Sequence, residues 1–176
     1  MTPPDGQQSP RTLGRHDRFG ASLSDVDEQF RRFVESVQDY AFILFSPDNR
    51  ITRWNPGAER LTGFSEAEVL GKAGSILFTP EDRAKGEDAA ELARAVREGR
   101  SENERWHVRK DGTRYWGSGV LVRLTDDRGN IIGLAKVMRD LTERRRAEET
   151  LRQSEEQFRL LVERVEFKPS AALDMP

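Results

Sequence analysis

The chain has 176 residues, of which 35% are hydrophobic and 34% charged, and its formal net charge is −2. This length suits one domain with extensions, and the balanced charge provides no basic field that would attract nucleic acid. Cysteine is absent, which removes disulfides, thiolate metal ligands and cysteine nucleophiles, and no apolar run approaches the roughly 20 residues of a membrane span.

The N-terminal part divides into two segments. Residues 1–22 are rich in Pro, Gly, Gln, Ser and Arg, which predicts a disordered leader. The leader lacks the charged-then-apolar order of a secretion signal, so we expect a cytoplasmic location. Residues 23–38 predict a flanking helix, because Phe30, Phe33 and Val37 recur on one helical face.

A β-hairpin follows. Residues 41–45 (AFILF) have strand propensity, and the Ser-Pro-Asp-Asn sequence at 46–49 is typical of a turn. Residues 50–54 alternate between apolar and polar side chains and predict the returning strand.

The middle of the chain predicts short helices and then one longer helix. Ser65 and Glu68 have the spacing of a capping box. Thr79 followed by Pro80 is a strong helix start, and Gly99 is placed to end that helix. The buried stripe expected on this long helix consists of Ala89, Leu92, Ala93 and Val96.

Three strands are predicted next, at 105–109, 113–124 and 131–139. They are separated by Lys-Asp-Gly and Asp-Asp-Arg-Gly-Asn, both of which are turn sequences. Two strands, several helices and three further strands predict an α+β fold, with a five-stranded antiparallel sheet and helices on one face.

The last patterned segment is a charged helix at 143–166. Its apolar side chains alternate in steps of four and three, which is typical of a coiled-coil seam and predicts a homodimer. A helix that folds back on the sheet is the alternative. Residues 151–165 match residues 23–37 at eight of fifteen positions, and residues 167–176 show no pattern. The seam consists of Ala147, Leu151, Ser154, Phe158, Leu161 and Val165.

Four blocks in order resemble bacterial PAS domains, the sensory modules of signalling proteins. They are DYAFILF (39–45), ITRWNPGAERLTGFS (51–65), VRKDGTRYW (108–116) and VMRDLTER (137–144). The resemblance implies a PAS domain at 39–142, with a small-ligand cavity between sheet and helices. It also implies dimerisation through the flanking helices and a partner or output domain such as a histidine kinase.

The end of the last strand carries the junction that the resemblance implies. Asp140, Leu141 and Thr142 are similar to the family's Asp-x-Thr sequence between sheet and output helix. An Asp can cap the helix while it pairs with a nearby donor, so a movement of the strand would change the orientation of the helix. The alternative is that Asp140 is only a cap.

Few of the residues that bind the family's known cofactors are present in this sequence. Gly74 stands where light-sensing flavin domains need their Cys, which excludes adduct chemistry, and His107, Gly117 and Met138 stand at the flavin-binding or flavin-sensing positions. Gly86 stands at the haem-ligand position. His107 therefore has a solvent-facing or hydrogen-bonding role as its simplest interpretation. The sequence therefore does not identify a cofactor. The alternative hypothesis is a sensor that binds flavin or haem non-covalently.

The remaining expectation concerns the cavity. No nucleophile–base set, phosphate loop or cluster of metal-ligating residues is evident, so we expect a binding module and not an enzyme. Side chains that only fill the core, in an adaptor without ligand, are the alternative. The expected lining consists of Leu44, Ile76, Phe78, Leu92, Trp106, Val108, Trp116, Ser118, Val120, Leu134 and Met138.

Overall fold

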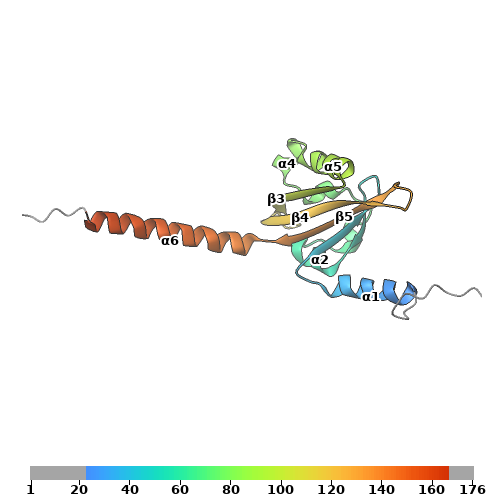
Figure 1. Cartoon of the computed structure of the whole chain (residues 1–176), viewed down its shortest axis with the longest axis horizontal. Helices are drawn as coiled ribbons and strands as arrows, with labels where there is room; N and C mark the ends of the chain where they lie inside the picture. The colour runs from blue at the N-terminus through green and yellow to red at the C-terminus, as the bar shows by residue number, and fades with distance from the viewer. Residues whose placement is uncertain (1–22, 167–176) are drawn as a thin grey trace, which may run out of the picture. The chain divides into compact units, whose positions relative to one another are not determined.

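The computed structural model describes residues 23–166, which fall into two units, one ending at Val37 and one beginning at Gln38 (Figure 1). The described part of the first unit is helix α1 (Leu23–Ser36). The aromatic rings of Phe30 and Phe33 are exposed on it, and its surface carries i,i+3 and i,i+4 ion pairs. The predicted leader at 1–22 and tail at 167–176 lie outside the described residues.

The second unit is built on one five-stranded antiparallel sheet (Figure 1). The strands lie side by side in the order β2-β1-β5-β4-β3, so the first hairpin joins the last strand at the centre of the sheet. This arrangement confirms the predicted fold class. The strands are β1 (Ala41–Phe45), β2 (Ile51–Trp54), β3 (Arg100–Val108), β4 (Arg114–Thr125) and β5 (Ile131–Asp140).

The first hairpin and the helix after it form as their sequence predicts. Asn49 adopts φ 62° in the turn, a conformation that Asn tolerates better than most residues. The side-chain oxygen of Asn55 accepts hydrogen bonds from the amides of Phe42 (2.8 Å) and Ala58 (2.9 Å). One side chain thus ties β1 to the start of α2 (Pro56–Thr62).

Two short elements cover the sheet between α2 and the long helical segment. The capping box of α3 (Glu66–Val69) is confirmed, because the Glu68 carboxylate accepts the Ser65 amide at 2.9 Å. A 3₁₀ turn, η1 (Gly74–Leu77), follows and places Leu77 in the core.

The predicted long helix is divided in two, which corrects the sequence prediction. Thr79 caps α4 (Pro80–Ala84) as expected, but Gly86 at φ 73° breaks the helix before α5 (Glu87–Glu98). The buried face of α5 also differs. Ala89 and Ala93 are exposed, whereas Glu91 and Ala95 are buried beside Leu92 and Val96. Exposing alanine side chains costs little free energy. Glu91 faces inward because its ionic partner, Lys136, lies in the interior.

The core lies between the sheet and the helices. Alternation in β1 and β5 points one set of side chains toward the helices. Strand β3 begins at Arg100, five residues earlier than the strand predicted at 105–109, because it pairs along β4 from Val122 onward. The inward apolar set includes Ala41, Ile43, Phe45, Leu134 and Met138, which pack with Val69, Leu77 and Phe78.

The chain leaves the sheet through helix α6 (Thr142–Glu166). The predicted seam residues Leu151, Phe158 and Leu161 are exposed on it, with 70% of Phe158 accessible. Ala147 and Ser154 are exposed as well, and Val165 lies in the helix, outside the described side chains. Within residues 23–166, no helix has the length and apolar content needed to cross a membrane.

Candidate functional site

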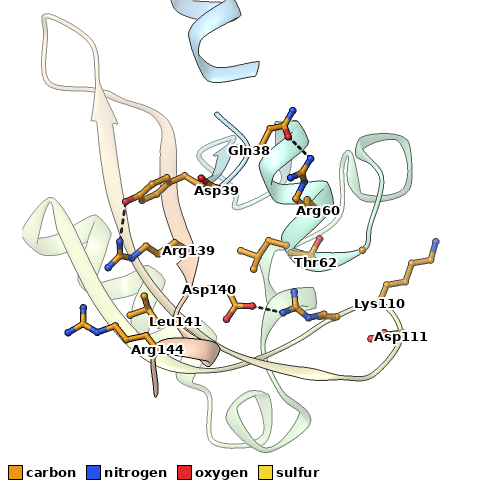
Figure 2. A pocket seen from close by; sticks show the side chains of 14 residues that line it. Gln38, Asp39, Arg60, Thr62, Lys110, Asp111, Arg139, Asp140, Leu141 and Arg144 are labelled. Atoms are coloured by element: carbon orange, nitrogen blue, oxygen red, sulfur yellow. Dashed lines mark hydrogen bonds and ion pairs between the residues drawn. The ribbon is translucent and has the colours of Figure 1, made fainter. Parts of the chain in front are cut away.

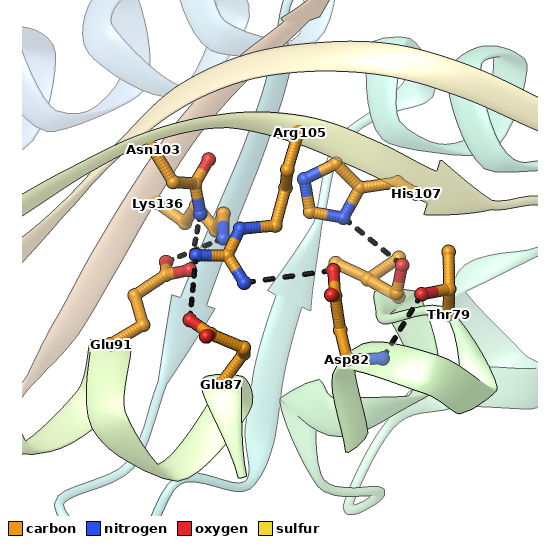
Figure 3. A network of polar contacts seen from close by, with 9 residues as sticks. Thr79, Asp82, Glu87, Glu91, Asn103, Arg105, His107 and Lys136 are labelled. Carbon is orange, nitrogen blue, oxygen red and sulfur yellow. Dashed lines mark hydrogen bonds and ion pairs between the residues drawn. The ribbon is translucent and has the colours of Figure 1, made fainter. Parts of the chain in front are cut away.

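The inner face of β3 is a row of polar side chains. Ser101, Asn103, Arg105 and His107 occupy alternate positions and therefore face the helices, whereas the residues between them face the opposite side. This row lies opposite α4 and α5 (Figure 3). The corresponding inner faces of β1 and β5 are mostly apolar, so the two halves of the interior differ in character.

A buried ion pair crosses the interior from β5 to α5. The Lys136 ammonium lies 2.6 Å from the Glu91 carboxylate, and each side chain is only 3% exposed. The Asn103 amide also donates to Glu91, so the carboxylate has partners on two strands (Figure 3). Burial lowers the pKa of Lys136 because it penalises the cation, and the charge of Glu91 opposes that effect.

Arg105 links the same strand to the other two acids of the network. Its guanidinium lies 3.2 Å from Glu87 and 3.6 Å from Asp82, so it bridges the start of α5 and the first turn of α4 (Figure 3). It also lies over the Phe78 ring, 5.6 Å from the centroid. Together with the Lys136–Glu91 pair, these contacts join α4 and α5 to the sheet from the interior.

His107 is completely buried, which corrects the solvent-facing interpretation and agrees with the hydrogen-bonding one. Its Nδ1 lies 3.0 Å from the Leu77 carbonyl, which can only accept, so Nδ1 donates the proton. The ring stacks on Tyr115, and a Cβ on Gly117 would come within 2.6 Å of it. Burial, followed by the charge of Lys136, lowers the pKa of His107 to about 3, and the ring is neutral.

Each residue of the β3 row keeps one buried polar atom without a partner among the described residues. These atoms are Ser101 Oγ, Asn103 Oδ1, Arg105 Nε and His107 Nε2. Unpaired buried polar atoms cost about 1–3 kcal/mol each, so each one needs an explanation, and a functional role is one. The adjoining cavity, between Phe45 and Lys136, measures only about 20 Å³, so in this state the interior is closed.

The eleven residues predicted to line one cavity do not surround a common space. Five of them lie on the inner side, namely Ile76, Phe78, Leu92, Leu134 and Met138. The other six are on the outer face of the sheet, because each alternates with the buried residues of its own strand, which include Ile43 on β1, His107 on β3 and Tyr115 on β4. The six are Leu44, Trp106, Val108, Trp116, Ser118 and Val120. Leu44 and Trp106 are 40% and 38% exposed.

The second candidate site is the exit from β5 to α6. The Asp140 carboxylate accepts the Thr142 amide at 2.7 Å and the Arg109 guanidinium at 2.5 Å. Figure 2 shows Asp140 and a dashed line for its ion pair. Partial burial acts to raise the pKa of Asp140, but these bonds from Thr142 and Arg109 outweigh it and lower the pKa below its usual value. Asp140 therefore both holds the helix start and ties it to the end of β3.

The backbone of β4 completes the exit. The Leu141 amide donates to the Trp116 carbonyl at 2.8 Å, and the Trp116 amide donates to the Thr142 hydroxyl at 2.8 Å. Thr142 is buried as a result. All three predicted junction residues thus contact each other or Trp116, and the strand β4 partner was not foreseen from the sequence.

An open groove lies beside the exit and is lined by several basic side chains (Figure 2). Arg139 contacts the Tyr40 hydroxyl at 3.3 Å, and Arg60 donates to Gln38. Lys110 pairs with Glu68, and Arg144 pairs with Glu148 at 2.8 Å. Lys110 and Arg144 are thus paired with acids, whereas the named partners of Arg60 and Arg139 are neutral groups. Among the residues that the structure describes, no group of acids and histidines is arranged to hold a metal ion.

The polar interior was missed because apolar residues were given priority in the sequence. Two signals were available. The alternation Ser-x-Asn-x-Arg-x-His at 101–107 indicates a polar strand face, and Lys136 interrupts an otherwise apolar strand. These local patterns do not show that the polar face of β3 and Lys136 both point toward α5, because that depends on the pairing of β3, β4 and β5.

An antiparallel sheet in the order β2-β1-β5-β4-β3, helices over one face and a capped exit helix define an α+β domain with a helical exit. Residues 39–143 match the PAS domain family, and the chain belongs to that family. A PAS domain from Colwellia psychrerythraea aligns with a TM-score of 0.62 at 23% identity, over 68% of this chain and 99% of that one.

Two curated relatives are signalling proteins. The chain is 42% identical over 123 residues to Two-component system protein A of Emericella nidulans, covering 70% of this chain and 18% of that protein. It is 28% identical to the methanogenesis regulatory histidine kinase FilI of Methanothrix harundinacea, covering 74% and 14%. The chain therefore spans less than a fifth of these relatives. PAS domains are sensory modules and generally not enzymes.

Flavin, the cofactor of some structural neighbours, does not fit the interior as it stands. A light-oxygen-voltage domain studied with a flavin analogue aligns with a TM-score of 0.57 at 25% identity, over 76% of this chain and 98% of that one. Here the His107 ring occupies the space above Gly117, and a Cβ at Gly74 would come within 2.8 Å of Phe45. The cavity of about 20 Å³ has room for about one water molecule.

Proposed function

We propose that this PAS domain is a signal-relay module in which a small ligand or partner acts on the polar interior and α6 carries the change to an output domain such as a histidine kinase. The observation that supports this most strongly is the construction of the exit. Asp140, Thr142 and the Trp116 backbone fix the first turn of α6, and the apolar residues farther along α6 are exposed. A helix of this kind needs a partner.

The proposed location of the protein is the cytoplasm. The proposed partner of α6 is the same helix in a second copy of the chain. Leu151, Phe158 and Leu161 recur at heptad spacing on the exposed surface of α6. Leu151→Asp should weaken the dimer in analytical ultracentrifugation, and the exposed polar Gln153→Asp is the matched control. A dimer unaffected by Leu151→Asp would place the interface elsewhere, with α1 as the next candidate.

The proposed input is a ligand without visible absorption, because the His107 ring fills the space above Gly117 and these two residues stand at flavin-binding positions. Absorption spectroscopy of the purified protein, before and after incubation with flavin mononucleotide or haemin, tests this. No visible band from bound cofactor is the expected result. A band that remains after gel filtration would support the alternative, a non-covalent flavin or haem sensor. A dimer with no ligand and no change of α6 would support an adaptor.

A further inference from the structure

The outer face of the sheet carries an aromatic pair beside the exit. The rings of Trp106 and Trp116 meet edge to face, with centroids 5.3 Å apart at an angle of 75°. The Trp116 indole N–H donates to Glu104 at 2.7 Å, which fixes the orientation of that ring. The two side chains belong to neighbouring strands and sit directly opposite each other in the β3–β4 register.

Arg145 in the first turn of α6 lies on this pair. Its guanidinium carbon is 3.8 Å from the Trp116 ring centroid and 5.9 Å from that of Trp106. The Arg145 amide donates to the Leu141 carbonyl at 2.9 Å, so the residue belongs to the first turn that the exit defines. A guanidinium stacked on an indole is a favourable cation–π arrangement and is directional, because it uses the face of the ring.

The first turn of α6 is therefore held from both faces of the sheet. On the inner side Asp140 pairs with Arg109 from the end of β3. On the outer side Arg145 stacks on Trp116, whose position on β4 neighbours Gly117, the register partner of Asp140. The bonds of Asp140, Leu141 and Thr142 all lie at the base of the helix, whereas Arg145 adds a contact farther along the first turn, which restricts rotation of the helix about its base.

We propose that Trp116 and Arg145 are positioning residues that set the direction in which α6 leaves the sheet. This role rests on the proposed relay through α6 and adds to it a second contact, independent of Asp140. A rearrangement of β4 or β5 changes the distance between ring and guanidinium, so the contact converts a shift of the sheet into a change of helix direction. Trp116 was predicted to line the ligand cavity, and its place on the outer face gives it this other role.

The test measures the direction of α6 by the distance between two spin labels. The chain contains no cysteine, so Asp127→Cys in the β4–β5 turn and Glu156→Cys on α6 provide two unique labels. Labelled chain is diluted in an excess of unlabelled chain, so that each dimer contains one labelled copy. Arg145→Gln removes the charge, Arg145→Lys keeps it, and Arg146→Gln is the matched control on the next residue.

The expected result is a broader distance distribution in Arg145→Gln, with the ratio of docked to undocked orientations about threefold lower, the size of one exposed cation–π contact. Arg145→Lys should recover part of the narrow distribution, and Arg146→Gln should match the parent. An unchanged distribution in Arg145→Gln would overturn the proposal. If Asp140→Ala then still broadens it, the relay stands without this contact; if neither does, the relay through α6 fails as well.

Discussion

The interior and the exit of this domain are built from different kinds of contact. The interior joins α5 to the sheet through one buried ion pair, Lys136 with Glu91, each 3% exposed, beside the partly exposed contacts of Arg105. The exit joins α6 to the sheet through bonds of partly exposed groups, such as Arg109 with Asp140. Disturbing buried charges costs several kcal/mol, while a surface ion pair contributes about 0–1 kcal/mol.

This difference suggests that the interior responds to the ligand and that the exit rearranges. A ligand that exchanges partners with buried charges has a large interaction energy available to it, because those charges are desolvated. The exit needs only a small energy to rearrange, so it can follow a change in the sheet without unfolding the domain. Lys136 and Asp140 both lie on β5, four residues apart, so the same strand connects the two regions.

The largest effect is expected from breaking the buried pair. Glu91→Gln leaves the Lys136 ammonium without a counter-charge, and we expect a loss of about 3–5 kcal/mol in the free energy of unfolding, measured by urea denaturation. The double variant Glu91→Leu/Lys136→Met is the control and should recover most of the loss. A cost below about 1 kcal/mol for the single variant, the level of a surface pair, would remove the contrast between interior and exit.

The second-largest effect is a pH dependence of the free energy of unfolding, which arises from His107 in the interior. The pKa of His107 is lowered to about 3, whereas in the unfolded chain it takes its ordinary value of about 6.5. The unfolded chain therefore binds a proton as the pH falls below that value while the folded domain does not. Stability is retained above pH ~6.5 and should fall by about 2 kcal/mol between pH 7 and pH 5.

Denaturation of the parent and of His107→Gln at both pH values measures this contribution. The variant should lose the slope over this window. Asp140 does not contribute there, because above pH 5 it is ionised in the unfolded chain, where its pKa is about 3.9, and in the folded domain, where its pKa is lower. An equal slope in parent and variant would mean that His107 is not held neutral.

The smallest effect on stability is expected at the exit. Asp140→Ala removes the bonds to Thr142 and Arg109, and we expect a change of within about 1 kcal/mol because the pair is partly exposed. The sheet should stay folded by circular dichroism, while the direction of α6 becomes less defined. Asp127→Ala, at an exposed carboxylate in the β4–β5 turn, is the control. A large loss of stability would show that Asp140 serves the fold and not the relay.

The fold was largely predictable from local patterns, and the interior was not. The hairpin at 41–54 and the caps at Ser65 and Thr79 depend on neighbouring residues, which the sequence displays directly. The face that α5 buries depends on Lys136, a residue 45 positions away from Glu91. Long-range pairing of two charges leaves no periodic signal in either segment.

The candidate site shows the same limit. Asp140 was found because its motif is continuous in sequence, whereas its partner Arg109 is 31 residues away. Trp116 was identified as important but assigned to the wrong face, since the parity of β4 is set by its register with β3 and β5. A shift of one residue in a strand reverses every side chain, so apolar character alone cannot decide the face.

Hydrogen–deuterium exchange of the double variant Glu91→Leu/Lys136→Met tests the link between interior and exit most directly. The variant changes the interior without leaving a buried charge unpaired, and it contains no substitution near the exit. We predict altered exchange in peptides covering 140–150 as well as in α5, with β2 unchanged. Altered exchange confined to α5 and β3, with 140–150 identical to the parent, would contradict the account.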